Sequence, residues 1–301
     1  MLKEEIINER RLPLRAPSVS TLVAVPGIKW LLLAIPLLYI CFLFIYSMLE
    51  IFRLSLFNDN GFTLEYFIRF FEQPVYWDVM LITMKIALMV TLISLVLGYP
   101  LAYLLTKIES DKWRKWMFAA VTIPLWISTL VRTYAWTFLL QTSGVINNIL
   151  ISIGLIDEPI RLIYNTTGVM IGMTHVLLPY MVLSLYSVIK GIDRNLVLAA
   201  EGLGAHPIRA FWNVYFPLSL TGILSGSLLV FVLSIGYFVT PSLLGGTNDV
   251  MISSLIKTQV SDLLNWNFGS AIAIVLLVVT LLLTGLSYLL LAKYSNVKEV
   301  K

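Results

Sequence analysis

Long apolar runs separated by short polar stretches make up most of this chain of 301 residues. A helix needs about 20 residues to cross the roughly 30 Å of hydrocarbon in a bilayer, and six runs reach that length. The runs are continuous and do not alternate between apolar and polar residues, which excludes a transmembrane β-barrel. The pattern predicts an all-α polytopic membrane protein whose six transmembrane helices lie near residues 30–54, 79–106, 116–140, 167–190, 218–244 and 267–292.

The polar loop over residues 191–217 contains a helical pattern of its own. An apolar stripe at helical spacing opens it, formed by Leu196, Ala199, Ala200 and Leu203. Gly204 offers a position at which this helix can end, and Pro207 suits the first turn of a second helix that runs through Phe211 and Trp212. Residues 196–217 are therefore predicted to form a helix-turn-helix hairpin.

The composition is that of a membrane protein. Hydrophobic residues make up 58% of the chain and charged residues 13%, against about 25% charged in soluble domains. The net charge of +4 is spread over several loops, so no nucleic-acid partner is expected. Cys41, the only cysteine, lies inside an apolar run and leaves neither a disulfide nor a cysteine metal site. Residues 1–29 lack a signal-peptide pattern, so they and residues 293–301 are expected to be cytoplasmic tails of a membrane domain over residues 30–292.

The distribution of Lys and Arg predicts the orientation, because cytoplasmic loops carry an excess of both. With the N-terminus inside, 15 of the 21 lie on the cytoplasmic side. These are Lys3, Arg10, Arg11, Arg15, Lys29, Lys107, Lys112, Arg114, Lys115, Lys190, Arg194, Arg209, Lys293, Lys298 and Lys301. The N-terminus, the C-terminus and the hairpin are therefore all predicted to be cytoplasmic.

The sequence shows no site from which this chain could itself draw the energy for transport. It has no Gly-x-x-x-x-Gly-Lys-Ser/Thr loop to hold nucleotide phosphates. Its two histidines, His175 and His206, offer neither a metal site nor a nucleophile–base pair. Glu50 is the one carboxylate clearly inside a predicted span, and Arg53, one turn on, is its expected ion-pair partner. Because no buried acidic proton relay is present, any solute transport is expected to draw its energy from a partner protein.

The hairpin resembles the signature loop of ABC-importer permeases, which reads Glu-Ala-Ala, three residues, Gly, nine residues, Ile-x-Leu-Pro. The aligned positions are Leu198, Ala199, Ala200, Gly204, Val214, Phe216 and Pro217. Leu198 stands in the glutamate position, which removes any ion pair that this glutamate would make with an ATPase. Glu201, three residues on, is the candidate replacement.

Further motifs resemble the spermidine/putrescine permease family over roughly residues 60–290, with a family core at about 80–290. They are Gly98–Tyr103, Leu130–Trp136, Gly144–Asn147, Gly154–Pro159 and Pro241–Gly246. Relatives that carry other small solutes share these motifs.

The resemblance implies a type I ABC-importer permease fold in a bacterial inner membrane. It implies a second, similar permease subunit, two cytoplasmic ATPases that bind ATP-Mg, and an extracytoplasmic solute-binding protein, with membrane lipid around the helices. No cofactor or metal is expected in this chain, which is not expected to be an enzyme. The hairpin would act as the coupling helix, through Leu198, Ala199, Ala200, Glu201, Gly204, Ala205, Pro207 and Pro217.

A polyamine cargo is a flexible polycation, for which a pathway would offer aromatic faces and a few carboxylates. The aromatic candidates are Trp126, Tyr134, Trp136, Tyr180 and Tyr237, although any one of them is more often a packing residue. Arg132 would repel such a cargo, so it is expected to pair with Asp157 or Glu158, or to face the binding protein. The carboxylates of the predicted outer loops, which attract cargo or binding protein or are merely solvated, are Glu65, Glu72, Asp249 and Asp262.

Three alternatives remain open at this point. The cargo could be another amine, an opine or an organophosphonate. An ion-coupled secondary transporter would be expected to show intramembrane carboxylates and repeat symmetry, and neither is visible. A membrane enzyme would need His, Asp or Glu clustered at membrane depth, and the sequence offers no such cluster.

Overall fold

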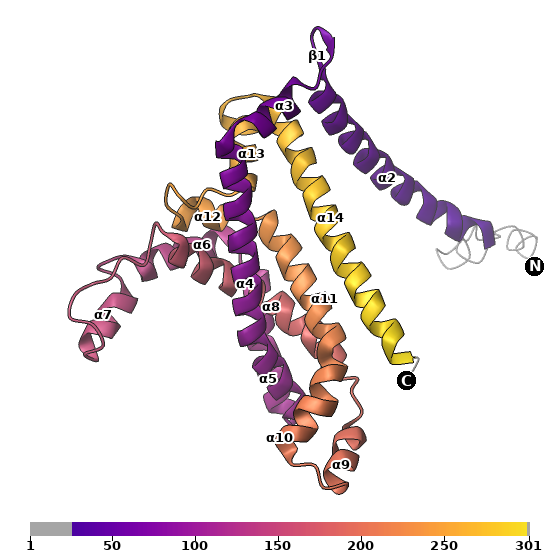
Figure 1. Ribbon diagram of the computed structural model, residues 1–301, viewed down its shortest axis with the longest axis vertical. Coiled ribbons are helices and arrows are strands. Elements are labelled where there is room, and N and C mark those ends of the chain that lie inside the picture. The colour runs from indigo at the N-terminus through magenta and orange to yellow at the C-terminus, as the bar shows by residue number, and fades with distance from the viewer. Residues whose placement is uncertain (1–25, 300–301) are drawn as a thin grey trace, which may run out of the picture. The chain divides into compact units, whose positions relative to one another are not determined.

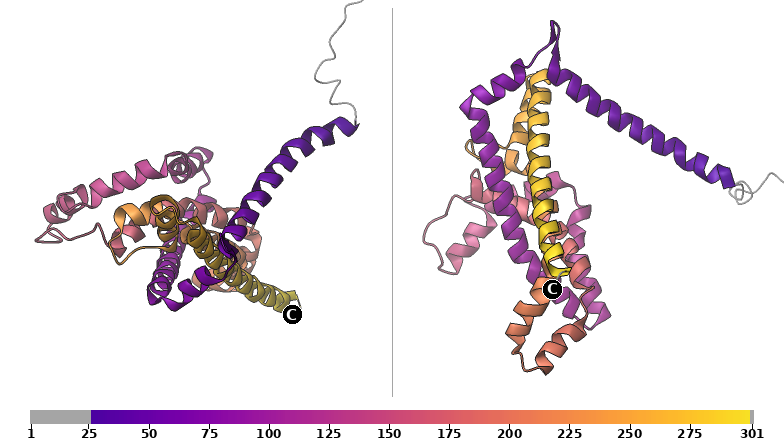
Figure 2. Two further views of the ribbon diagram at one scale, coloured as in Figure 1. Left: turned by 90° about the horizontal axis from the view of Figure 1, so that it is seen from above. Right: turned by 45° about the vertical axis from the view of Figure 1, so that its right-hand side comes forward.

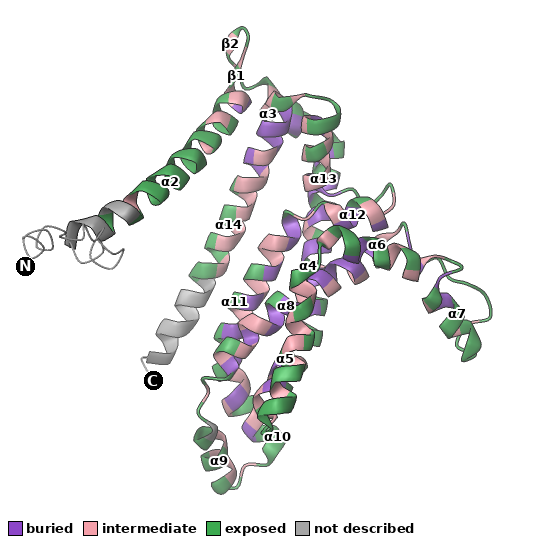
Figure 3. Ribbon diagram, turned by 180° about the vertical axis from the view of Figure 1, so that it is seen from behind, coloured by how far each residue is buried: buried purple, intermediate pink, exposed green. Residues whose placement is uncertain are grey.

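The computed structural model describes residues 26–299. Residues 1–25 of the predicted N-terminal tail and residues 300–301 of the predicted C-terminal tail lie outside the described part of the chain. Two compact units meet between Arg53 and Leu54. The first unit ends within the helix α2 (Pro26–Leu56), which is long and apolar enough to cross a membrane. Its apolar side chains are exposed over most of its length, as expected of a helix that lies in lipid (Figure 3).

The second unit contains the other described helices and one short pair of antiparallel strands (Figure 1). Its elements are β1 (Phe57–Asn58), β2 (Gly61–Phe62), α3 (Glu65–Glu72), α4 (Pro74–Lys107), α5 (Asp111–Trp126), α6 (Thr129–Leu140), α7 (Val145–Ser152), α8 (Thr166–Ile189), α9 (Arg194–Gly202), α10 (Pro207–Ala210), the π-helical turn η1 (Phe211–Tyr215), α11 (Phe216–Ile235), α12 (Val239–Leu244), α13 (Ile252–Lys257), the π-helical turn η2 (Thr258–Asp262) and α14 (Trp266–Glu299).

The core of this unit lies where α4, α8 and α11 pack side by side. Glycines allow the close approach. A β-carbon added to Gly98 of α4 would lie 2.9 Å from Met181 Cγ, and one added to Gly226 of α11 would lie 3.0 Å from Met181 Sδ. The fully buried Met181 of α8 is thus held between two glycines. Small residues let neighbouring transmembrane helices gain van der Waals contact that lipid does not replace. Outside this trio, α7 projects away from the bundle in both views of Figure 2.

Continuous helices occupy the positions of four of the six predicted spans, namely α2, α4, α8 and α14. The third predicted span, 116–140, is formed by two helices and not by one continuous helix. The chain bends by 100° between α5 and α6, where Ile127 and Ser128 are extended with ψ angles of 134° and 133°. Pro124, near the end of α5, weakens that end of the helix because it lacks an N–H. Among the described helices, five could cross a membrane, or six if the bent pair is one span.

The fifth predicted span, 218–244, is likewise formed by two helices. The helix α11 stops at Ile235, and a separate helix, α12, follows after a turn. Gly236 favours a helix end, and Pro241 lacks the N–H that would bond to the Tyr237 carbonyl in an unbroken helix. Hydrophobicity continues across this turn, so the apolar pattern alone did not reveal it.

Candidate functional site

The predicted hairpin is present, and it lies at the end of the bundle opposite α3 and α13 (Figure 1). Its first arm, α9, ends in a Schellman motif. The Gly204 N–H donates to the Glu201 carbonyl at 2.9 Å, and the Ala205 N–H donates to the Ala200 carbonyl at 3.1 Å. Gly204 has a φ of +88°, where a β-carbon is unfavourable. The elbow between the two arms therefore depends on this glycine.

The second arm starts at Pro207, the first residue of α10. Proline has no N–H, which costs nothing in a first turn, where N–H groups lack helical partners. The side chain of His206 caps this turn, because its Nδ1 accepts a hydrogen bond from the Ile208 N–H at 3.4 Å. This histidine therefore has a local structural role.

The second arm runs without a break into the apolar helix α11, so that Pro207–Ile235 is one membrane-length segment. Pro217 lies near the start of α11 and cannot donate to the Asn213 carbonyl, four residues back. The π-helical turn η1 accommodates the mismatch, because the Phe216 N–H bonds to the Phe211 carbonyl, five residues back. Any displacement of the hairpin elbow is thus passed directly to a helix of the core.

An aromatic anchor, formed by Tyr99, Tyr103, Phe211 and Tyr215, holds the second arm against α4. The ring centroids of Tyr103 lie 5.2 Å from those of Tyr215 and 5.8 Å from those of Phe211, both edge to face. Edge-to-face pairs contribute about 0.5–1.5 kcal/mol each beyond the area they bury. The Tyr99 hydroxyl also lies 3.0 Å from the Ser219 hydroxyl of α11. The base of the hairpin is therefore fixed to two core helices.

The outward face of the hairpin carries large apolar side chains. This hairpin surface consists of Leu196, Leu198, Leu203, Ile208 and Trp212, all of them exposed. Leu203, next to the elbow, is 89% exposed. Leu196, Ala199 and Leu203 of the predicted stripe are thus exposed, and Ala200 is half-buried. Exposed apolar groups gathered on one element are typical of a protein-interaction surface.

Leu198 occupies the signature's glutamate position and is 52% exposed. Glu201, one turn further along α9, is half-buried. No ion pair involves Glu201 within the described part of this chain. Its carboxylate is thus free of competing ion pairs, and its role as a replacement for the missing glutamate stays a prediction.

The structure separates the five aromatic pathway candidates into two groups. Trp126, Tyr134 and Tyr180 are exposed, on α5, α6 and α8. Trp136 and Tyr237 are half-buried and take part in polar contacts with neighbouring helices.

The polar contacts follow one face of α6. The residues of this α6 polar face are Thr129, Arg132, Thr133 and Trp136, at the spacing i, i+3, i+4 and i+7. The Trp136 Nε1–H donates to His175 Nδ1 on α8 at 3.1 Å. The Thr129 and Tyr237 hydroxyls lie 3.1 Å apart, as do those of Thr133 and Thr240 of α12.

Four members of this polar cluster were not predicted from the sequence: Thr129, Thr133, His175 and Thr240. The sequence holds part of the evidence for them, because polar residues at helical spacing inside an apolar run mark the inward face of a helix. The partners on α8 and α12 could not be recognised without the bend before α6, because that bend turns the face toward them.

Arg132 lacks the ion pair that was expected for it. It is 8% exposed, and its one hydrogen bond runs from Nη2 to Thr129 Oγ1 at 3.2 Å. Among the residues that the structure describes, its Nε and Nη1 have no hydrogen-bond partner, and Asp157 and Glu158 are exposed on the loop after α7. The predicted pairing with these carboxylates was wrong, because that loop projects away from the bundle. An arginine left partly unpaired in a buried position costs stability.

We expect Arg132→Met to raise the thermal stability of the purified chain. Methionine fills similar space without a charge to desolvate, and an uncompensated buried charge costs about 3–5 kcal/mol. The unfolding midpoint in detergent should rise by several degrees, whereas Arg161→Met, at an exposed arginine, should leave it unchanged. A lower midpoint for Arg132→Met would show that the guanidinium stabilises this fold.

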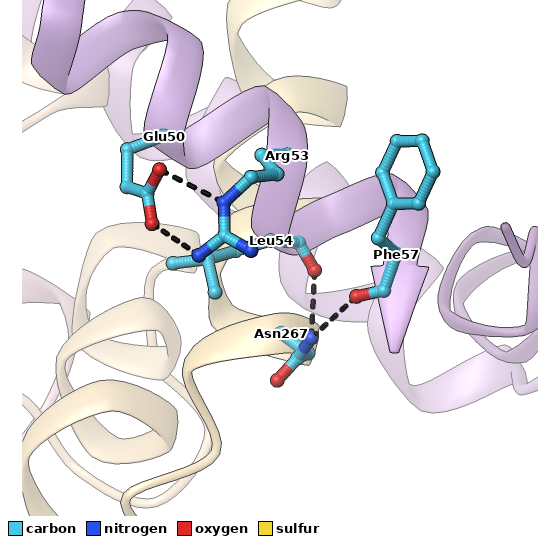
Figure 4. Close-up of polar contacts among 5 residues, drawn as sticks. All are labelled: Glu50, Arg53, Leu54, Phe57 and Asn267. Atoms are coloured by element: carbon cyan, nitrogen blue, oxygen red, sulfur yellow. Dashed lines mark hydrogen bonds and ion pairs between the residues drawn. The ribbon is translucent and has the colours of Figure 1, made fainter. Parts of the chain in front are cut away.

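The pairing predicted for Glu50 is confirmed. The Arg53 Nε–H donates to Glu50 Oε2 at 2.9 Å, and a second hydrogen bond joins Nη2 to Oε1 (Figure 4). Figure 4 also shows the Asn267 amide of α14 donating to the Leu54 and Phe57 carbonyls at 2.9 Å each. These carbonyls lie at the end of a helix, where no helical donor remains. The Glu50–Arg53 contacts are local, whereas the Asn267 contacts join the start of α14 to residues far away in the sequence; both sets are structural.

The four carboxylates assigned to outer loops differ in their surroundings. Glu65 and Glu72 are exposed at the ends of α3, and Asp262 pairs with Lys257 at 2.7 Å. Asp249 is buried and holds a loop, because it accepts hydrogen bonds from the Thr166 hydroxyl and the Gly246 N–H. This loop and the start of α8 line an open cavity of about 660 Å³.

A family model described as "Binding-protein-dependent transport system inner membrane component" matches residues 94–296. The chain is 38% identical over 218 residues to the spermidine/putrescine transport system permease protein PotB of Escherichia coli (strain K12), which covers 72% of this chain and 78% of that protein. It is 36% identical over 226 residues to PotB of Haemophilus influenzae, covering 75% and 78%.

Two solved structures share the fold. One is a bacterial ABC transporter involved in the import of the acidic polysaccharide alginate, with a TM-score of 0.61 and 20% identity over 86% of this chain and 96% of that one. The other is the alginate transporter in complex with an alginate pentasaccharide-bound periplasmic protein, with a TM-score of 0.64 and 19% identity over 86% and 93%. At these identities the likeness concerns the fold alone.

Proposed function

Because the chain belongs to the family of binding-protein-dependent transport system inner membrane components, we propose that it is a permease subunit of an ATP-driven importer, coupled through its hairpin to a separate ATPase. Members of this family are transport components and not enzymes. The chain is accordingly a multi-pass protein of the inner membrane. We further propose how the chain obtains its energy, which proteins assemble with it and which solute it carries.

The hairpin is the observation that carries the coupling proposal. It combines an exposed apolar surface around Leu203 with an elbow fixed by Gly204 and a second arm continuous with α11. A plain connector between two helices would need none of these features. An ATPase that binds the hairpin surface and moves on ATP binding would shift α10, η1 and α11 together. Such a rigid-body movement can open the bundle to one side or the other.

The orientation follows from the excess of Lys and Arg on the hairpin side. We place the hairpin, the N-terminus and the C-terminus in the cytoplasm, with six spans between the tails and the bent pair α5–α6 counted as one. A second, similar permease would supply the other half of the pathway, and two ATPases holding ATP-Mg would sit below. A solute-binding protein would deliver cargo to the opposite side, where the cavity near Asp249 opens.

We propose a polyamine cargo, spermidine or putrescine, on the basis of the PotB relatives. Half-buried aromatic rings at Trp136 and Tyr237 suit a cationic solute. Arg132 has its charged group turned into the protein and only 8% of its surface exposed, so it does not form a cationic lining. The ion-coupled secondary transporter is not favoured, since the relatives belong to binding-protein-dependent systems.

Two measurements test this function. Cells that carry the complete system and no other polyamine importer should take up labelled spermidine or putrescine, and a variant of the companion ATPase that cannot hydrolyse ATP should abolish the uptake. Calorimetry on the companion binding protein should show binding of at least one polyamine. If it binds none in a panel of polyamines, the cargo assignment is overturned; if uptake persists without ATP hydrolysis, the transport mechanism is overturned.

A further inference from the structure

A small cationic cavity lies beside the base of the hairpin. Its volume is about 210 Å³, and its walls come from the ends of α4 and α8, the start of α5, and α9. A water molecule occupies about 30 Å³ in the liquid, so this space suits a phosphate-sized anion with part of its hydration. Its position differs from that of the predicted translocation pathway, because none of the five aromatic candidates lines it.

Three cationic side chains from three parts of the chain line the cavity: Lys107 of α4, Arg114 of α5 and Lys190, the residue that follows α8. Among the residues that the structure describes, none of those lining the cavity is acidic. Like charges held around so small a space repel one another unless an anion lies between them. Tyr186 adds a neutral hydroxyl to the lining, whereas the Thr106 hydroxyl already donates to the Tyr103 carbonyl at 2.7 Å. This donor set matches the oxygens of a phosphate group.

Among the described residues, the two lysines are held in place without an ion-pair partner. Lys107 Nζ lies 5.2 Å from the ring centroid of Tyr103, and Lys190 Nζ lies 5.8 Å from that of Tyr186. Aromatic faces attract an ammonium group but leave its N–H groups free for a ligand. Arg114 has a carboxylate partner, Asp111, whose side chain is 73% exposed, so this surface pair contributes little.

The remaining acidic groups nearby do not fill the cavity. Glu109 is exposed on the loop between α4 and α5, and it does not line the space. Asp193 caps α9, where its carboxylate accepts a hydrogen bond from the Asn195 N–H at 2.9 Å. An anion that balances Lys107 and Lys190 must therefore come from outside the described part of this chain.

The setting indicates where that anion comes from. Trp113 and Trp116 flank Arg114 on α5 and are 69% and 65% exposed. Exposed tryptophans at a helix end mark the depth of lipid headgroups, and basic pockets between helices at this depth bind anionic headgroups. We propose that the cavity binds the phosphate group of an anionic phospholipid.

A bound phosphate would join α4, α5 and α8 to the hairpin, because Ile192 and Val197 form the wall on the hairpin side. It would thereby stiffen the base on which the hairpin turns. This consequence for coupling rests on the proposed function. Binding of the lipid does not, so it is measured on the purified full chain without any transport assay.

The test compares lipid retention by native mass spectrometry in two variants. Lys107→Gln with Lys190→Gln removes two lining cations, and the matched control, Lys112→Gln with Lys115→Gln, removes two exposed lysines of α5 that do not line the cavity. With phosphatidylglycerol as the probe, we expect the first pair to lower retention by about tenfold or more and the control to leave it within about twofold. Phosphatidylcholine should bind weakly to all three proteins. The conservative pair Lys107→Arg with Lys190→Arg should retain phosphatidylglycerol, which separates loss of binding from misfolding.

Three outcomes would overturn the lipid site. Equal phosphatidylglycerol retention by the lining variant and the control would show that the cavity does not hold it. If inorganic phosphate in lipid-free detergent raised the unfolding midpoint of the native chain but not of the lining variant, the ligand would be the free anion. If the lining variant kept its lipid but lost the companion ATPase, the cations would serve that protein. Loss of transport in every sample, with the lipid difference intact, would count against the proposed function and leave the lipid site standing.

Discussion

Gly204→Val is expected to lower ATP-driven uptake by about tenfold or more while the chain still inserts and folds. Gly204 has a φ of +88°, where a side chain costs roughly 1–2 kcal/mol and a β-branched one more. No atom lies within 4 Å of an added β-carbon, so the effect comes from the backbone conformation and not from a clash. The elbow would relax, and α9 would no longer hold its angle to α10. Uptake in cells, alongside the amount of chain in the membrane, measures this effect.

The same hairpin provides the controls for this prediction. Gly202→Ala changes a neighbouring glycine that also has open space around it but lies within α9, so uptake should remain normal. Gly204→Asn should retain much of the activity, because asparagine tolerates the left-handed conformation better than other side chains. Normal uptake by Gly204→Val, or equal losses in Gly204→Asn and Gly204→Val, would contradict the argument from backbone geometry.

Leu203→Asp is expected to reduce binding of the companion ATPase by about tenfold to a hundredfold. Leu203 is 89% exposed at the elbow, and full burial of a leucine stabilises a complex by about 1.5–3 kcal/mol. The variant loses that contribution and adds a carboxylate that must be desolvated. Co-purification of the ATPase with the permease, followed by titration, measures the change.

Two other leucines make this prediction specific. Leu263→Asp alters an exposed leucine after η2, far from the hairpin along the bundle, and should leave ATPase binding unchanged. Leu198→Glu restores the residue that the importer signature has at this position, so binding should be kept or improved. If Leu198→Glu weakens ATPase binding as much as Leu203→Asp does, the alignment of this loop with the importer signature is wrong.

The hairpin could be predicted from the sequence because its determinants are local. Gly204 and Pro207 each act through their own backbone properties, and both positions need only their immediate neighbours to be interpreted. The apolar stripe of α9 was also visible, but its outward direction was not, because a stripe alone does not tell a core face from a docking face.

The bends at Ser128 and Gly236 could not be predicted from hydrophobicity, since apolar residues continue on both sides of each. These bends nevertheless build the site, because they turn α6 so that Thr133 faces Thr240 and Trp136 faces His175. The arginine at 132 was likewise misjudged, because its expected carboxylates lie on a loop whose direction only the fold reveals. Local sequence patterns therefore predicted individual helices, whereas the contacts between helices that are distant in the sequence could be recognised only from the tertiary structure.

The central claim, that a separate ATPase docks on the hairpin surface, is tested most directly by cross-linking. Cys41 is the only cysteine in the chain, so a Cys41→Ser background allows one new thiol at a time. In the assembled transporter, Leu203→Cys should give a cross-linked product with the ATPase subunit through a short bifunctional reagent, and Leu263→Cys should give none. If the thiol at 203 yields no product with the ATPase, or if the thiol at 263 yields as much, the hairpin is not the coupling site.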